Sequence, residues 1–249
     1  MTSVCAIAIQ NLTKDYGDTK AVDNLSLSIS EAEVFGLLGP NGAGKSTTIN
    51  CLTGLLKPTA GTIQVGGFDV GTEGSKVREI LGVSPQETAI YSHLTGRENV
   101  RLFGALYSVP KEKLDASVDK MMEKVGLMDE ADRRVGKCSG GMKRRVSIAM
   151  ALVQNPRIVL LDEPTVGMDP QSRRAIWDFV MELRDEGKTI VLTTHYMEEA
   201  EELCDRVGII DHGRLIELGS PAELKAKYGT KNLEDVFIQL TGRRIREGA

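Results

Sequence analysis

The sequence predicts an α/β core with a small antiparallel β layer near its N-terminus and an inserted helical lobe. Three observations support this prediction. The short apolar run at residues 33–38 leads directly into a glycine-rich segment and then a helix start. The continuous apolar run Ile158–Leu161 is typical of a strand buried on both faces of a sheet. From about residue 95 to residue 153 the apolar positions follow a helical period.

Composition limits the class of protein. The chain has 249 residues, 41% hydrophobic and 27% charged, which is ordinary for a globular protein. Its net charge of −4 argues against a nucleic-acid partner, which usually selects a basic face. The four cysteines form no C-x-x-C pair, so we expect reduced, mostly packed thiols. No apolar stretch approaches the ~18 residues of a membrane span and no signal-peptide pattern is present, so a membrane role would require a partner chain.

The first part of the chain predicts the antiparallel layer. Residues 4–9 predict a strand, followed by a turn at Tyr16-Gly17. Apolar and serine residues alternate over residues 25–30, the period of a half-buried strand. A short run at residues 63–65, bounded by glycines, predicts a further strand of the same layer.

The middle and C-terminal parts alternate strands with helices. Residues 80–84 predict a strand that runs into Pro85-Gln86. Apolar residues between Leu114 and Val125 recur at helical spacing, and a second helix is expected over roughly Gly141–Val153. Further expected elements are a helix around residues 176–183, a strand at 189–194, a hairpin around His212-Gly213, a helix capped by Ser220, a helix over 233–240, and a solvated basic tail at Arg243–Arg246.

The segment Gly39–Thr47 has the composition of a phosphate-binding loop. Its glycines let the backbone curl so that successive N–H groups point into one concavity, and the following helix adds its positive end. Lys45 can reach the β- and γ-phosphates of a nucleotide, and the Ser46 hydroxyl is placed to ligate Mg²⁺.

Polar residues follow three other predicted strands. Gln86 follows the strand at 80–84, Asp162 and Glu163 follow the run at 158–161, and His195 follows the strand at 189–194. In a parallel α/β sheet, ligands bind at the carboxyl ends of the strands. We therefore expect these residues and the phosphate loop to meet at one edge.

Each of these residues has a role that its position suits and a plainer alternative. Asp162 is placed to bind Mg²⁺ directly or indirectly; the alternative is that it caps the next turn. Glu163 can polarise an attacking water or accept its proton; the alternative is a solvated carboxylate. Gln86 can reach Mg²⁺ or the water, or is a loop amide. His195 can hydrogen-bond the γ-phosphate, or is structural. Tyr16 can stack on adenine, worth about 1–3 kcal/mol by analogy with other base–aromatic contacts, or packs in its turn.

With these residues in hand, the chain resembles the ATP-binding subunit of ATP-binding-cassette (ABC) transporters over essentially its whole length. The matching motifs occur in the family's order. They are Gly39–Thr47 (Walker A), Gln86 (Q-loop), Cys138-Ser139-Gly140-Gly141-Met142 (signature), Ile158–Glu163 (Walker B), Val166-Gly167-Met168-Asp169 (D-loop) and His195 (switch histidine).

The resemblance implies a P-loop NTPase (RecA-like) core with an antiparallel β subdomain and an inserted α-helical subdomain. It implies a single ABC nucleotide-binding domain over residues 1–249, with the helical lobe at about 88–153 and a C-terminal helical tail at about 220–249. Segments Cys138–Pro170, Leu233–Phe237 and Leu240–Arg243 are similar to the drug-resistance exporter branch (ABC-2 type).

The family also implies an ATPase that works as a head-to-tail dimer with an identical or paralogous subunit. Two MgATP molecules would lie between one subunit's phosphate loop and the other's signature, where the helix start at Ser139 can grip a γ-phosphate. The dimer would power transport, and in this branch export, through a separate membrane-spanning permease at the cytoplasmic face of the membrane. The implied nucleotide-binding residues are Tyr16, Asn41, Gly42, Ala43, Gly44, Lys45, Ser46, Thr47, Asp162, Ser139, Gly140, Gly141 and Asp169; the catalytic ones are Glu163, His195 and Gln86; the Mg²⁺ ligands are Ser46, Gln86 and Asp162.

Two positions depart from the family pattern. Cys138 stands where the family usually has Leu, and Met142 where it often has Gln. Cys138 is still a small apolar packer, whereas Met142 lacks the hydrogen bonds of an amide.

Other functions remain as alternatives. A soluble ABC ATPase of the iron–sulfur scaffold type would share every catalytic motif and differ only in its partner. DNA-repair and translation ATPases of the superfamily usually need long coiled coils or two cassettes in one chain. A P-loop kinase has no use for the element Ser139–Gly141, and a non-hydrolysing nucleotide switch requires Glu163 to be misplaced.

Overall fold

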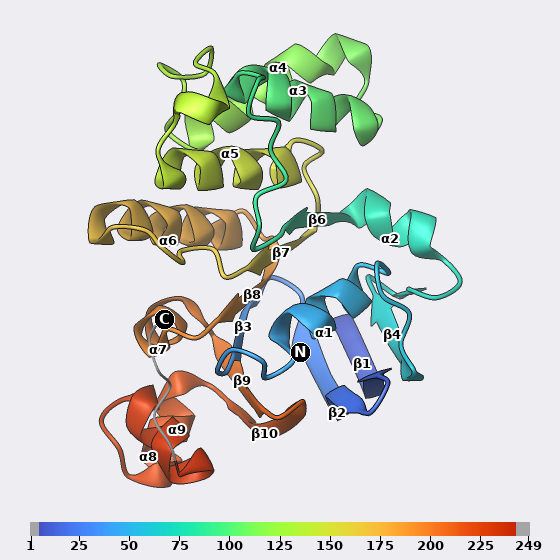
Figure 1. Ribbon diagram of the computed structural model, residues 1–249, viewed down its shortest axis with the longest axis vertical. Coiled ribbons are helices and arrows are strands. Elements are labelled where there is room, and N and C mark those ends of the chain that lie inside the picture. Colours follow the sequence, from blue (N-terminus) through green and yellow to red (C-terminus); the bar gives the residue numbers. More distant parts are fainter. Residues whose placement is uncertain (1–4, 243–249) are drawn as a thin grey trace.

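The computed structural model describes residues 5–242 (Figure 1). The first residue of the strand expected at 4–9 and the basic tail Arg243–Arg246 therefore lie outside the described residues.

A mostly parallel sheet occupies the centre of the molecule, with the strand order β10-β9-β3-β8-β7-β6. All neighbours in this sheet pair in parallel except β10, which is antiparallel to β9. The strands are β3 (Val34–Leu38), β6 (Leu81–Ser84), β7 (Ile158–Asp162), β8 (Thr189–Thr194), β9 (Arg206–Asp211) and β10 (Arg214–Gly219).

A second, antiparallel sheet has the order β2-β1-β4-β5. Its strands are β1 (Cys5–Tyr16), β2 (Thr19–Ser30), β4 (Ala60–Val65) and β5 (Phe68–Asp69). The chain turns between β1 and β2 at Gly17, which has a positive φ of 58°. The predicted antiparallel layer and its first turn are confirmed.

In Figure 1, α1 lies between the sheets, α3, α4 and α5 form a lobe at one end of the molecule, and α8 and α9 lie at the other end. The bounds are α1 (Lys45–Leu52), α2 (Gly74–Ile80), α3 (Gly96–Leu106), α4 (Lys111–Lys124), a 3₁₀ turn (Val135–Lys137), α5 (Gly140–Leu152), α6 (Pro170–Asp185), α7 (Met197–Leu203), α8 (Pro221–Tyr228) and α9 (Leu233–Thr241). None of the helices within residues 5–242 combines the length and the apolar character that crossing a membrane requires.

The parallel sheet is buried on both faces, as its continuous apolar runs predict. Along β7, Val159 and Leu161 belong to the cluster shared with the helical lobe and α6. Ile158 and Leu160 belong to the cluster that fills the space around α1 and the antiparallel sheet. Because neighbouring residues of a strand point to opposite faces, one apolar run contributes to both cores.

The strand predicted at residues 80–84 starts one residue later, because Ile80 is the last residue of α2. The sequence analysis did not predict α2 or α7. Both have seven residues, and neither begins with a side-chain cap hydrogen bond. Only Val77 of α2 is buried, so this helix shows no apolar stripe from which it could be recognised.

Candidate functional site

The polar residues expected at the strand ends do meet at one edge of the parallel sheet. Strands β3, β8, β7 and β6 are parallel neighbours, so their carboxyl ends lie side by side. The phosphate loop follows β3, and Gln86 lies two residues after β6. Asp162 is the last residue of β7, Glu163 follows it, and His195 follows β8.

The phosphate loop wraps around the start of α1. Gly44 has a φ of +101°, and a Cβ atom at this position would lie 2.4 Å from the carbonyl oxygen of Ala21, so a larger residue would strain the loop. No side chain caps α1, which leaves the N–H groups of its first turn directed at the loop. The ammonium of Lys45 is bonded to the carbonyl oxygens of Gly39 (2.8 Å) and Pro40 (3.1 Å).

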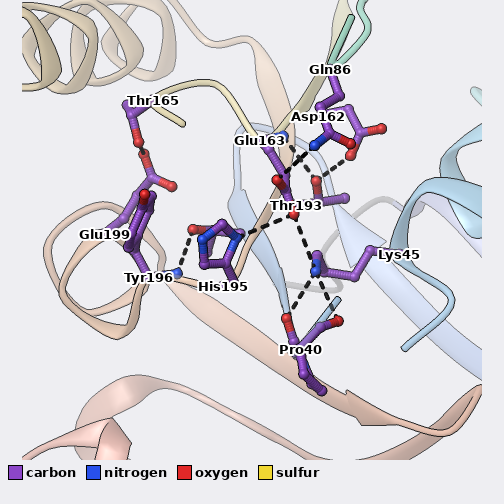
Figure 2. Close-up of polar contacts among 12 residues, drawn as sticks. Pro40, Lys45, Gln86, Asp162, Glu163, Thr165, Thr193, His195, Tyr196 and Glu199 are labelled. Carbon is purple, nitrogen blue, oxygen red and sulfur yellow. Dashed lines mark hydrogen bonds and ion pairs between the residues drawn. The ribbon is translucent and has the colours of Figure 1, made fainter. Parts of the chain in front are cut away.

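Glu163 is the residue on which the other side chains converge (Figure 2). Gln86 Nε2 donates to its Oε2 over 3.1 Å. Lys45 Nζ lies 3.2 Å and His195 Nδ1 lies 3.3 Å from its Oε1. The Glu163 backbone has a positive φ of 47°, and its N–H donates to the carbonyl oxygen (3.2 Å) and the hydroxyl (3.0 Å) of Thr193.

The charges in this cluster depend on one another. Burial acts to raise the pKa of Glu163, but the hydrogen bond from His195 and the charge of Lys45 outweigh it and leave the pKa below its ordinary value. Burial also lowers the pKa of Lys45, although Glu163 and Asp162 oppose the shift. Glu163 is therefore an ionised carboxylate at neutral pH, held beside a buried cation.

The oxygen donors at this edge have the chemistry that Mg²⁺ prefers. Asp162 is buried, and its Oδ1 accepts a hydrogen bond from the hydroxyl of Thr193. The hydroxyl of Ser46 lies in the first turn of α1, and the amide of Gln86 is at the same edge. Among the described residues no cluster of three His, Cys, Asp or Glu side chains could hold a metal by itself. Mg²⁺ is usually held by one or two protein oxygens together with phosphate and water.

The signature residues lie elsewhere in the molecule. Ser139 caps α5, accepting a hydrogen bond from Met142 N–H over 3.2 Å, and Gly140 and Gly141 form the first turn. Within residues 5–242, no hydrogen bond or ion pair is recorded between residues 138–142 and the phosphate loop at 39–47. Figure 1 shows α5 in the lobe, separated from α1 by the parallel sheet and α6.

Asp169 and Tyr16 are likewise outside the Glu163 cluster. Asp169 caps α6, accepting hydrogen bonds from Ser172 N–H (2.9 Å) and Ser172 Oγ (2.7 Å). Tyr16 is 48% exposed at the end of β1, with the ammonium of Lys14 5.2 Å from its ring centre. The same hairpin touches the phosphate loop at Ala21.

The structure adds three residues that the sequence analysis did not assign to the site. Thr193 forms hydrogen bonds with both Asp162 and Glu163. The sequence feature that could have identified it is the pair Thr193-Thr194 at the end of a buried strand. Glu199 of α7 is fully buried and accepts hydrogen bonds from the Thr165 hydroxyl (2.7 Å) and the Trp177 indole (3.0 Å). Arg144 is buried against the backbone of the site. In the sequence it appears only as part of a basic triplet.

The fold and the phosphate loop define a P-loop ATPase, and comparisons with known proteins specify the family. A family model described as "ABC transporter" matches residues 22–166. The linearmycin resistance ATP-binding protein LnrL of Bacillus subtilis (strain 168) is 44% identical over 238 residues, 96% of this chain and 75% of that protein. The daunorubicin/doxorubicin resistance ATP-binding protein DrrA of Streptomyces peucetius is 44% identical over 228 residues, 92% of this chain and 69% of that protein.

Solved structures agree. An ATP-binding subunit of an ABC transporter matches with a TM-score of 0.85 and 26% identity, covering 95% of this chain and 99% of that one. CbiO1 from Clostridium perfringens, part of the ABC transporter complex cbiONQ, matches with a TM-score of 0.81 and 31% identity, covering 90% and 92%. The chain belongs to the ABC transporter family, as one of its ATP-binding, ATP-hydrolysing subunits. The alternative of an iron–sulfur scaffold ATPase is not favoured, because these relatives are resistance and transporter proteins.

Proposed function

We propose that two such subunits, identical or paralogous, close head to tail around two MgATP molecules and power export through a separate permease. The observation that carries this proposal is the convergence of Lys45, Gln86 and His195 on the carboxylate of Glu163. Polar groups brought from separate segments to one carboxylate are the arrangement that positioning an attacking water beside a γ-phosphate requires.

The loop residues would bind the nucleotide. The amides of Asn41, Gly42, Ala43, Gly44, Lys45, Ser46 and Thr47 line the concavity before and at the start of α1. Lys45, whose ammonium is bonded to the carbonyl oxygens of Gly39 and Pro40, would exchange these contacts for phosphate oxygens. Tyr16, exposed on the hairpin that touches the loop, is the proposed stacking surface for adenine.

Mg²⁺ would be held by Ser46, Asp162 and Gln86, and when bound it offsets the negative charge that develops on the phosphates. Thr193 fixes the orientation of the Asp162 carboxylate. Glu163 would orient the attacking water and accept its proton, while His195 stabilises the transferring phosphoryl group. Catalysis of this kind depends on positioning and electrostatics more than on covalent chemistry.

The second subunit would complete the site. The helix start at Ser139, Gly140 and Gly141 offers N–H groups to an anion and, being remote from its own phosphate loop, is free to face the loop of a partner. Asp169, at the start of the adjacent helix, would lie at the same contact between subunits. Loss of the γ-phosphate would then weaken the dimer.

We propose that residues 1–249 act as one nucleotide-binding domain, with the lobe at about 88–153 and a C-terminal helical tail at about 220–249. The lobe and Gln86 would transmit closure to a docked permease at the cytoplasmic face of the membrane. The relatives named for drug resistance support export over import. The proposed docking to a permease can be tested by isolating the chain from detergent-solubilised membranes and identifying the membrane-spanning protein that accompanies it.

The hydrolytic role is tested with Glu163→Gln. We expect the ATPase rate to fall by about 10²–10⁴-fold, the usual range for loss of a general base. Binding of the fluorescent analogue mant-ATP should be retained, because the substitution leaves the phosphate loop at 39–47 and Lys45 unchanged. Size-exclusion chromatography should show a dimer that persists in ATP.

Glu198→Gln is the matched control, since this carboxylate is exposed and lies 3.9 Å from Arg173, outside the Glu163 cluster. Its ATPase rate should match that of the unmodified chain. An undiminished ATPase rate in Glu163→Gln would reject the assigned role.

A further inference from the structure

Arg144 is a buried arginine that is satisfied by backbone carbonyls. It lies on α5, in the second turn after the cap at Ser139, and is 6% exposed. None of the ion pairs recorded within residues 5–242 involves it. Its guanidinium donates instead to Asp162 O (2.6 Å), Pro164 O (3.1 Å), Gln86 O (3.4 Å) and Pro85 O.

These four carbonyls belong to two segments that each carry a residue of the proposed hydrolytic site. Pro85 and Gln86 follow β6, whereas Asp162, the last residue of β7, and Pro164 flank Glu163. The side chains of Gln86 and Glu163 meet over 3.1 Å across the same gap that the guanidinium bridges through the backbone. One side chain therefore holds both segments that form this contact.

The chemistry of arginine suits such a bridge. Its planar group offers five N–H donors in a fixed fork, while lysine offers one compact ammonium on a flexible stem. Burial lowers the pKa of Arg144 to about 10, and the guanidinium is still protonated at neutral pH. A buried charge without a paired carboxylate is costly unless its donors are satisfied, and here the carbonyl oxygens satisfy them.

We infer that Arg144 is a positioning residue that sets the spacing between Gln86 and Glu163 and links that spacing to the signature end of α5. The inference rests on the proposed function, in which Gln86 and Glu163 handle the attacking water. Because Ser139, Gly140 and Gly141 form the cap and first turn of the same helix, a displacement of the signature turn shifts the guanidinium and, with it, both backbones.

Arg145 provides a matched comparison. Its Nη1 also donates to two backbone carbonyls, those of Val125 (3.1 Å) and Gly126 (3.2 Å). Both carbonyls follow α4 inside the lobe, away from the Gln86 and Glu163 segments. If α5 simply required arginine at these positions, substitution of Arg144 and of Arg145 would lower the ATPase rate equally. A positioning role predicts that only substitution of Arg144 lowers it.

The test compares Arg144→Lys with Arg145→Lys in the full chain. For Arg144→Lys we expect kcat for ATP hydrolysis to fall about ten- to a hundredfold, the range produced by a displacement of about 1 Å in a reacting group. The KM for ATP and the Kd for mant-ATP should stay within about twofold, since the phosphate loop is untouched. Arg145→Lys should leave kcat within about twofold.

A double-mutant cycle with Gln86→Ala then asks whether Arg144 acts through the Gln86 segment. Coupled residues give non-additive effects, so Arg144→Lys should lower kcat less in the Gln86→Ala background than in the unmodified chain. The inference would be overturned if kcat fell equally in Arg144→Lys and Arg145→Lys, or if the effects of Arg144→Lys and Gln86→Ala on kcat were additive.

Folding is monitored by far-UV circular dichroism and urea unfolding, with Arg144→Gln as a second variant that keeps two amide donors. If both Arg144 variants unfold while Arg145→Lys folds, the role of Arg144 is structural and the inference is wrong. Glu163→Gln is measured alongside: turnover retained in that variant counts against the proposed function. An inactive Glu163→Gln together with indistinguishable lysine variants counts against Arg144 alone.

Discussion

At the scale of single residues, Glu163 combines a strained backbone with a crowded carboxylate. A left-handed backbone costs on the order of 1–3 kcal/mol for a residue other than glycine, and the φ of +47° is held by the bonds from its N–H to Thr193. In this conformation the side chain of Glu163 points toward Lys45, Gln86 and His195 (Figure 2). Because its pKa is held below the ordinary value, Glu163 is a weak base, and orienting the water is the larger part of its proposed role.

Glu199 is the residue for which the structure predicts a clear pH dependence. Burial, only partly opposed by hydrogen bonds from Thr194, Thr165 and Trp177, raises the pKa of its carboxyl. As the pH rises above the unfolded value of about 4.3, the unfolded chain releases this proton first. The native state then binds more protons than the unfolded state, so the free energy of unfolding decreases until the pH reaches the folded pKa, and is constant above it.

We therefore predict that Glu199→Gln is more stable than the unmodified chain at neutral pH. The amide keeps an oxygen acceptor for Thr165 and Trp177 and has no charge to bury. The difference in unfolding free energy should increase with pH by at most about 1.4 kcal/mol per unit, the limit for one proton. Urea unfolding of both chains between pH 5 and pH 8 measures it, and two curves that stay parallel would show that Glu199 does not titrate as described.

At the scale of elements, β6 of the parallel sheet packs closely against α5 of the lobe. A Cβ atom on Gly82 would lie 2.2 Å from the carbonyl oxygen of Ala151 and 2.7 Å from Pro156 Cγ. A helix backbone cannot move aside as a flexible side chain can. The glycine in this strand therefore sets the distance between the sheet and the helix that carries Arg144 and the signature turn.

We predict that Gly82→Ala lowers the free energy of unfolding by about 1–3 kcal/mol, the usual cost of overpacking a core. Gly74→Ala is the control, because its Cβ atom would meet only the flexible end of Arg78, at 3.2 Å. Chemical unfolding of both variants gives the comparison. If Gly82→Ala is as stable as Gly74→Ala, the packing of β6 against α5 is looser than described.

At the scale of the whole molecule, the two parts of the proposed site lie at different places on the surface. The phosphate loop is at the edge of the parallel sheet, and the signature turn is on the lobe. The signature turn lies beside the start of α6, since the hydroxyl of Ser172, which bonds Asp169, is 3.1 Å from the position of a Cβ atom on Gly141. A second subunit that engages the signature turn would therefore contact the starts of both α5 and α6.

Gly140 gives a direct test of the dimer. A Cβ atom there meets no atom of the described residues within 4 Å, and an acidic residue in the first turn of a helix is favourable. Gly140→Asp should therefore fold with its stability changed by less than about 0.5 kcal/mol. In the Glu163→Gln background it should lose the ATP-dependent dimer, because its carboxylate would face the γ-phosphate bound by the partner subunit.

Gly140→Asn is the control for side-chain size in that experiment. Asparagine and aspartate are nearly equal in size, but asparagine carries an amide in place of the charged carboxylate. Size-exclusion chromatography with MgATP at low salt compares the variants. The dimer should be weaker for Gly140→Asp than for Gly140→Asn. A full dimer with Gly140→Asp would mean that the signature turn does not face a bound nucleotide.

The sequence by itself determined the features that depend on neighbouring residues. The apolar run before Gly39, the loop at Gly39–Thr47, the helix start after it and the cap at Ser220 are local patterns, and the structure has each of them. The strands expected at 158–161 and 189–194 also followed from their apolar residues, whereas their parallel pairing with each other was found in the structure. Helix α2 was missed because it is short, uncapped and mostly exposed.

Only the tertiary structure decided which side chains touch. That Gln86, Lys45 and His195 meet on one carboxylate depends on strand order and register, which bring together residues as much as 150 positions apart in the chain. The burial of Arg144 against Pro85 and Pro164 likewise depends on how α5 packs over two strands. A local pattern records the propensity of a segment, whereas the contacts of a buried charge are set by long-range packing that no single segment encodes.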